Sequence, residues 1–193
     1  MRTYKRLKAH NLSGFTIVEL LVTLTIVVLV TGIIMIRYSS FNSSVLLSGQ
    51  AYLTAFDIRE AQALAVSVRG NQSEFKEEYG MYFTTSTPTE YLIFQDDDSN
   101  GDHTPVRYHV GEGLGTYKVD SRFMITNICV TTGGAQTCGI DDIAISFRRP
   151  DFDASFYSTE AGNITAAEII FGSPNSTITR SVVVYSSGQI SVD

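Results

Sequence analysis

Apolar residues fill one long stretch near the start of the chain, from Leu20 to Ile36. Seventeen residues make roughly 25 Å of α-helix at a rise of about 1.5 Å per residue, which nearly spans the roughly 30 Å hydrocarbon core of a bilayer. Phe15 to Val18 extend the stretch toward the N-terminus. We therefore expect residues 15–36 to form the membrane-spanning half of a long helix.

From Arg37 onward the apolar positions recur at alternating steps of four and three, which places them on one face of a helix. Asp57, Glu60 and Ser67 fall on other faces. We expect residues 37–70 to form an amphipathic half of the same helix, packed on a sheet and ended by Gly70-Asn71 as a C-cap. The predicted buried stripe is Leu47, Ala51, Thr54, Ile58, Ala61, Ala65 and Val68.

Beyond Gly70 the period of the pattern changes to two, which is typical of strands. A helix followed only by strands predicts an α+β fold, with the long N-terminal helix packed on an antiparallel β-sheet head over residues 71–193. The predicted strands are Gly80 to Thr84, Tyr91 to Gln95, Val106 to Val110, Arg122 to Val130, Ile140 to Phe147, Ala167 to Phe171, Arg180 to Tyr185 and Gln189 to Val192.

The charges around the apolar stretch predict how the helix is oriented in the membrane, and they include a carboxylate that needs a partner. The first ten residues are basic, so by the positive-inside rule this end stays in the cytoplasm and the head lies outside it. Glu19 places a carboxylate inside the apolar segment, where an unpaired charge costs on the order of a few kcal/mol. An ordinary secretory signal would have a small-residue cleavage site after the apolar run, and Ile36-Arg37-Tyr38 offers none.

The run Gly14-Phe15-Thr16-Ile17-Val18-Glu19 resembles the type IV prepilin class, which includes the pseudopilins of type II secretion. The resemblance implies a leader over residues 1–14, cleavage by an inner-membrane prepilin peptidase between Gly14 and Phe15, and methylation of the Phe15 amine. It also implies that Glu19 pairs with the amine of a neighbouring subunit in a helical filament built on an inner-membrane assembly platform. A plain single-pass anchor is the alternative, and it explains neither Gly14 nor Glu19.

Two further segments are similar to the GspH/FimT minor pseudopilin family, though more loosely. They are Asp57 to Leu64 in the helix and the closing hairpin from Ser181 to Val192. This likeness implies a structural subunit that sits first in the inner membrane by a single span and then in an extracytoplasmic filament. We expect no enzyme, because the sequence presents no Ser/His/Asp or Cys/His constellation.

Charge weighs against nucleic acid as a partner. The leader holds four of the 14 Lys and Arg residues and none of the 20 Asp and Glu residues, so the remaining chain carries 10 − 20 = −10. Affinity for a duplex depends largely on basic side chains that neutralise phosphates. The DNA-binding branch of the family carries a Gly-Arg-x-Arg pattern where this chain has Gly188-Gln189-Ile190-Ser191. A DNA-binding minor pilin for natural transformation stays the weaker alternative.

The two cysteines, Cys129 and Cys138, flank Gly133-Gly134 as two strands joined by a tight loop would place them. Because an exported head faces an oxidising compartment, we expect a disulfide between them. Two free thiols are the alternative.

One acidic loop has the residue pattern of a calcium site. Asp96, Asp98, Asn100 and Asp102 match the first seven positions of a calcium loop, and Gly101 suits its sharp turn. The twelfth position is Arg107, where an EF-hand has a bidentate Glu. The sequence leaves open two interpretations, a solvated hairpin tip and a calcium site, and with the second a calcium-stabilised major pseudopilin.

Overall fold

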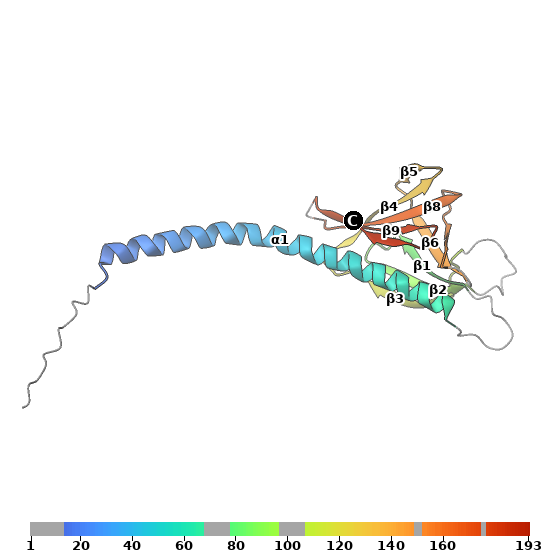
Figure 1. Ribbon diagram of the computed structural model, residues 1–193, viewed down its shortest axis with the longest axis horizontal. Helices are drawn as coiled ribbons and strands as arrows, with labels where there is room; N and C mark the ends of the chain where they lie inside the picture. Colours follow the sequence, from blue (N-terminus) through green and yellow to red (C-terminus); the bar gives the residue numbers. More distant parts are fainter. Residues whose placement is uncertain (1–13, 68–77, 97–106, 149–151, 175–176) are drawn as a thin grey trace, which may run out of the picture. The chain divides into compact units, whose positions relative to one another are not determined.

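A computed structural model of the chain describes residues 14–67, 78–96, 107–148, 152–174 and 177–193, without the side chains of 36–42. The chain divides into two compact units, Met1–Ser43 and Ser44–Asp193. One helix, α1 (Ile17–Val66), runs from the first unit into the second, and the strands all belong to the second (Figure 1). The α+β class expected from the sequence is confirmed.

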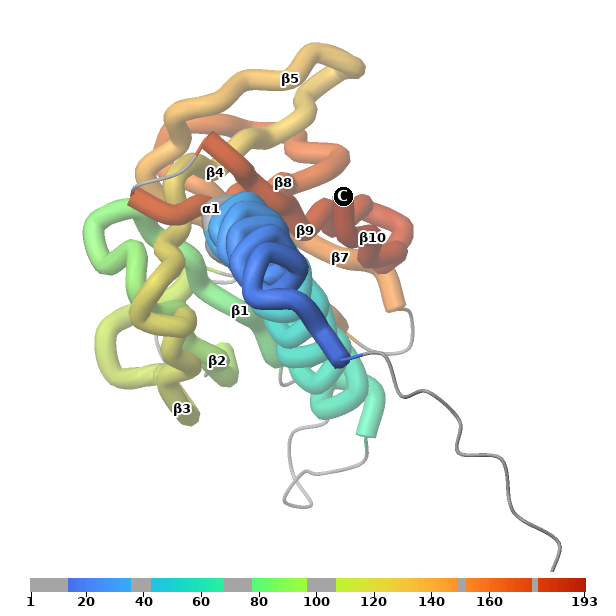
Figure 2. The backbone as a smooth tube through the Cα atoms, turned by 90° about the vertical axis from the view of Figure 1, so that its left-hand side faces the viewer, coloured from blue at the N-terminus to red at the C-terminus, as the bar shows by residue number. Residues whose placement is uncertain are grey.

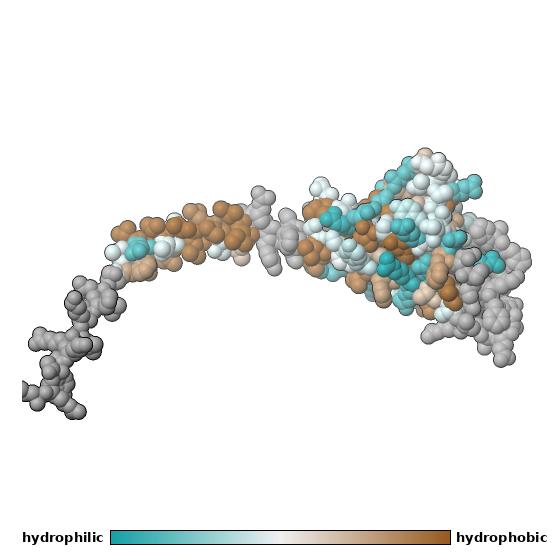
Figure 3. All heavy atoms as spheres, viewed as in Figure 1, coloured by the Kyte–Doolittle hydropathy of each residue, from teal (hydrophilic) through white to brown (hydrophobic). Residues whose placement is uncertain are grey.

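Helix α1 is continuous and ends at Val66, four residues before the predicted cap at Gly70. Val68 and Gly70 lie outside the described residues. Every side chain from Ile17 to Met35 is exposed, and Figure 3 shows these residues as an almost unbroken band of hydrophobic surface. The first part of α1 therefore has no packing partner within its own compact unit, as a helix surrounded by lipid or by other helices would have none.

The strands form two antiparallel sheets, where the sequence predicted a single sheet. Sheet A has the order β3-β2-β1-β6-β7, and sheet B has the order β10-β9-β8-β4-β5 (Figures 1 and 2). The strands are β1 (Glu78–Thr84), β2 (Glu90–Asp96), β3 (Gly113–Lys118), β4 (Met124–Thr132), β5 (Ala135–Cys138), β6 (Asp142–Phe147), β7 (Ala154–Tyr157), β8 (Ile164–Gly172), β9 (Thr179–Tyr185) and β10 (Ile190–Val192).

The second part of α1 shares one hydrophobic core with both sheets. Its core-facing side chains include Ala51 and Ile58, and fully buried members of the same core include Phe83 of sheet A and Phe171 of sheet B. Each large side chain buried in this way stabilises the fold by about 1.5 to 3 kcal/mol relative to exposure. The buried helix face consists of Leu47, Gln50, Ala51, Thr54, Ala55, Ile58, Ala61 and Ala65, which includes every described residue of the predicted stripe.

The opposite face of this part of α1 is not simply polar, as an amphipathic helix would be. Val45, Tyr52, Leu53 and Phe56 expose between 53% and 67% of their surface. Asp57 and Glu60, which the sequence placed away from the core, lie farther along the helix. An exposed apolar strip therefore accompanies the charged positions.

The predicted strand at Val106 to Val110 is wrong for its described residues. Residues 107–109 are irregular and a turn follows at Val110-Gly111. The Tyr108 ring packs instead on the outer face of sheet A, with ring centroids 4.8 Å from Tyr82 and 5.7 Å from Phe94. Burial of this ring outweighs the strand preference of the local sequence. The strands β3 and β7 were not predicted, and β5 was expected only from the position of Cys138 after the tight loop.

Side-chain amides connect α1 to distant loops. Gln50 accepts a hydrogen bond from the backbone N–H of Asp120 at 3.0 Å. Gln62 donates from Nε2 to the carbonyls of Phe152 at 3.0 Å and Gly188 at 3.2 Å. Gly188 sits in the turn between β9 and β10, which lie side by side in Figure 2. Gln62 thus fixes both the C-terminal hairpin and the loop at Phe152 to the helix through their backbone carbonyls.

Candidate functional site

The N-terminal end of α1 is defined by a side-chain cap. Thr16 accepts a hydrogen bond at Oγ1 from the backbone N–H of Glu19, at 3.3 Å, and its carbonyl accepts the first helical bond, from Leu20, at 3.1 Å. A hydroxyl at this position satisfies one of the N–H groups that the first helical turn leaves without a partner. Thr16 therefore fixes the point at which the chain enters the apolar helix.

Glu19 occupies the third position of the first turn and is exposed. A carboxylate here lies at the positive end of the helix dipole. The spacing Thr16-x-x-Glu19 is that of a capping box, a helix-start signal that the sequence analysis did not use. The cap explains why a negative charge is tolerated at this end, but within the described residues Glu19 has no ion-pair partner.

Gly14 and Phe15 precede the helix and are accessible. Phe15 exposes 72% of its surface, and a side chain added at Gly14 would meet nothing within 4 Å. Both residues lie outside the hydrogen-bonded helix, so a peptidase would not have to unwind a helical turn to reach the bond between them. The remainder of the predicted leader, residues 1–13, lies outside the described residues.

The segment Ile17–Met35 is long and apolar enough to cross a membrane. Its two central hydroxyls are satisfied within the helix, because Thr23 donates to the Leu20 carbonyl at 2.9 Å and Thr25 to the Leu21 carbonyl at 2.8 Å. Such internal bonds remove the cost of placing a hydroxyl in hydrocarbon. Glu19 is the charged side chain of this segment, and it stands at its N-terminal end.

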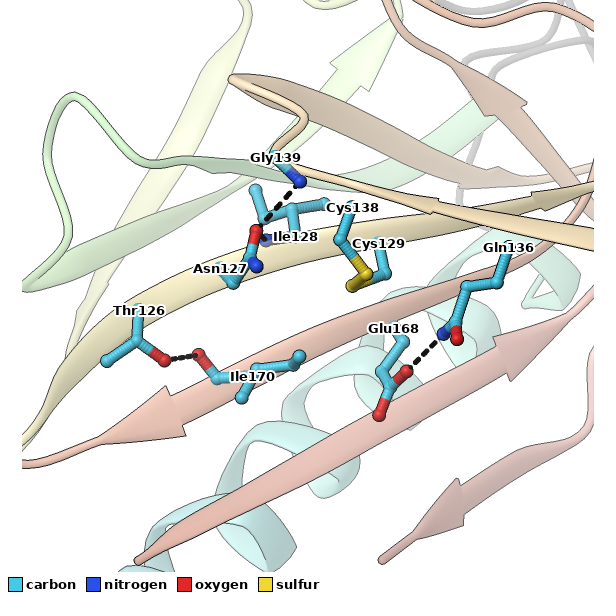
Figure 4. The surroundings of a disulfide bond; sticks show 9 residues. All are labelled: Thr126, Asn127, Ile128, Cys129, Gln136, Cys138, Gly139, Glu168 and Ile170. Carbon is cyan, nitrogen blue, oxygen red and sulfur yellow. Dashed lines mark hydrogen bonds between the residues drawn. A yellow bond between two sulfur atoms is a disulfide. The ribbon is translucent and has the colours of Figure 1, made fainter. Parts of the chain in front are cut away.

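Cys129 and Cys138 form the expected disulfide. The two cysteines are directly opposite one another in the β4–β5 ladder, and the turn between the strands uses Gly133 and Gly134 with positive φ. Next to the bridge, Asn127 accepts backbone N–H bonds from Ile128 and Gly139, both at 2.9 Å (Figure 4). The bridge therefore secures an edge strand whose four residues are all exposed.

The proposed calcium loop falls mostly outside the described residues. Asp96 ends β2 and faces Glu78 in the β1–β2 ladder, while Asp98, Asn100 and Asp102 are not described. In the described part of the chain no group of three or more His, Cys, Asp or Glu side chains is placed to hold a metal ion. Calcium binding at Asp96, Asp98, Asn100 and Asp102 stays a prediction.

No protein-family model, curated protein or solved structure matches this chain.

Proposed function

We propose that this protein is a minor subunit of a type IV pilus-like or type II secretion filament. In this account the leader of residues 1–14 is removed after insertion into the inner membrane. The apolar part of α1 holds the subunit there until it joins the filament. The mechanism is assembly: helices of neighbouring subunits replace lipid around Ile17–Met35, and the acidic head faces outward.

The observation that carries this proposal is the carboxylate of Glu19 in the first turn of a fully exposed apolar helix. Hydrocarbon makes a lone charge there costly, so a fixed cation in the same layer stabilises it. Cleavage after Gly14 creates such a cation, the amine of Phe15, in every subunit. A neighbour displaced along the filament axis can present its amine to Glu19, which satisfies both charges and sets the axial register.

The exposed strip of Val45, Tyr52, Leu53 and Phe56 supports assembly over a plain anchor. These side chains lie beyond the segment that can cross a membrane, so lipid does not account for them. Contiguous apolar surface outside a membrane is typical of protein contacts. A neighbouring subunit in a filament would cover the strip, whereas a single anchored head would leave it in water.

Charge disfavours the rival proposal of DNA uptake. Two of the exposed arginines of the head are already paired with carboxylates, Arg122 with Asp120 at 2.7 Å and Arg148 with Glu78 at 3.2 Å. With a net charge of −10 without the leader, the head repels a phosphate backbone.

The proposal is tested by separating insertion from assembly. Glu19→Ala should insert and be processed as the natural chain is, because neither step uses the proposed pair. Its recovery in sheared filaments should fall on the order of tenfold, since a cost of about 1.4 kcal/mol already changes an equilibrium that much. Asp153→Ala, which removes an exposed carboxylate of the head, is the matched control and should assemble normally.

Normal filament recovery of Glu19→Ala at normal expression would refute the charge-pair mechanism. Gly14→Val is expected to block removal of the leader. If the uncut variant also keeps the activity of the natural protein while it stays in the membrane, the protein is a plain single-pass anchor and not a filament subunit.

A further inference from the structure

The outer face of sheet B contains a hollow of about 280 Å³. Its floor is made by Ala166 and Val183, and its walls by Gln136, Glu168, Tyr185 and Asp193. The strand register explains the depression, because Ala166 stands between the larger Thr131 of β4 and Tyr185 of β9 in one cross-strand row. The small side chain leaves room between taller neighbours.

The wall formed by β5 is held in position by two links. Gln136 of β5 donates a hydrogen bond from Nε2 to Oε2 of Glu168 on β8 at 2.6 Å, across β4. The disulfide joins β5 to Cys129 of β4, which is directly opposite Glu168 in the β4–β8 ladder (Figure 4). Figure 4 shows the Gln136 and Glu168 side chains pointing toward one another on the same face as the bridge. The β5 side of the hollow is therefore linked to β4 and β8 by a disulfide and a side-chain hydrogen bond.

The charged side chains that line the hollow are both carboxylates. Among the described residues, neither Glu168 nor Asp193 takes part in an ion pair. Tyr185 adds an aromatic wall that is 40% exposed. The combination of carboxylates with an aromatic ring matches a guanidinium group, which bonds carboxylates through a planar fork of donors and stacks on aromatic faces.

Size narrows the choice of ligand. Pockets for drug-sized molecules and cofactors have volumes of roughly 300 to 1,000 Å³. At about 280 Å³ and open to solvent, this hollow stands at the lower end of that range, a size that accommodates one long side chain. A lysine fits the charge but is a compact, strongly hydrated ion that gains less from the planar wall.

We propose that this hollow binds an arginine side chain presented by a partner protein. The inference does not rest on the filament function, because the site is complete within the head of one chain. It gives that head a recognition surface with a defined chemistry on the outer face of sheet B.

The test is a titration of the ¹⁵N-labelled full chain in detergent micelles with N-acetylarginine amide, followed by NMR. We expect saturable shifts at the amides of Gln136, Ala166 and Glu168 at millimolar ligand. N-acetylcitrulline amide has the same shape without the charge and should cause none. Glu168→Gln should weaken binding about tenfold, as expected for loss of a charge-assisted bond, while Glu160→Gln, outside the hollow, should leave it unchanged.

A second variant guards against misfolding as the cause. Ala166→Leu fills the floor without changing charge, and it should abolish the shifts while the remaining spectrum keeps the pattern of the folded chain. Equal shifts with citrulline, or binding that survives both Glu168→Gln and Ala166→Leu, would overturn the proposal. Equal affinity for N-acetyllysine amide would overturn the assignment to arginine.

Discussion

The Tyr91 hydroxyl of β2 donates a 2.6 Å hydrogen bond to Oδ2 of Asp57 on α1. Beside it, Tyr117 of β3 stacks on Tyr91 with ring centroids 5.6 Å apart and donates to Oε2 of Glu60 at 3.0 Å. Two tyrosines of sheet A thus contact two carboxylates one helical turn apart. This pair of contacts ties the helix to an edge of sheet A that the apolar core does not fully cover.

The Asp57 contact predicts a pH dependence of stability. Burial raises the pKa of the Asp57 carboxyl, the charge of Glu60 raises it further, and the bond from Tyr91 opposes both. A raised pKa means that the folded state binds the proton more tightly, so the stability this group contributes is present below pH 3.8 and is lost as pH rises through the folded pKa. Asp57→Asn should therefore be at least as stable as the natural chain at pH 7, and the difference should vanish below about pH 4. Denaturant unfolding between pH 3.5 and 7 measures this, and parallel curves would contradict it.

Tyr91 and Tyr117 predict a second pH dependence of stability, at alkaline pH. Burial and the bond to Glu60 raise the pKa of Tyr117 to about 12, and burial and the bond to Asp57 raise the pKa of Tyr91 above its usual range. The unfolded chain loses these protons near pH 10, so stability should fall between about pH 10 and 12. Tyr91→Phe should reduce that fall, whereas Tyr185→Phe, outside the cluster, should not. Thermal melts across this range provide the measurement.

At Gly188 we expect even a substitution by alanine to reduce the stability of the fold. Its φ is +75°, and a Cβ there would collide with the Phe152 carbonyl and crowd Nε2 of Gln62. Gly188→Ala should lower the free energy of unfolding by about 2 to 4 kcal/mol, the sum of a left-handed backbone and a displaced loop. Gly139→Ala, with φ of +89° and open space around it, should cost only about 1 to 2 kcal/mol. Equal losses in the two variants would show that the contact with Phe152 has no role.

Loss of the disulfide should loosen one edge of sheet B without unfolding the core. The bridge closes a sequence separation of nine residues, which is worth about 2 to 3 kcal/mol in the chain-entropy model. β5 pairs only with β4 and has no buried residue, so the double variant Cys129→Ser with Cys138→Ser should lose hydrogen-exchange protection first at β5. Uniform loss of protection over β8 and β9 would contradict this expectation.

The sequence predicted the strands that alternate between core and surface. β1, β2, β8 and β9 lie within a few residues of their predicted bounds, because apolar residues of the core recur at every second position in them. The strands that the period of two did not indicate, β3, β5 and β7, lie at sheet edges. β3 contains Gly113 and Gly115, and β5 is exposed throughout, so neither carries a period of two. Pairing with a neighbour, and not local pattern, makes them strands.

The division into two sheets was also beyond the sequence, because pairing between distant strands leaves no mark in a single chain. The candidate assembly segment was easier to find, since Gly14, Phe15 and Glu19 all lie in the short run from Gly14 to Glu19. In the structure Phe15 is exposed and Gly14 is accessible, as the predicted cleavage site requires. The hollow on sheet B could not be found in advance, because Gln136 of β5 and Glu168 of β8 meet only through the pairing of both strands with β4.

Intact-mass analysis of the native protein, purified from sheared filaments, tests the central claim most directly. The account predicts one species that begins at Phe15 and carries one added methyl group, and it predicts that Gly14→Val accumulates as the uncut precursor in the membrane. A chain that still begins at Met1 in assembled filaments would contradict the account.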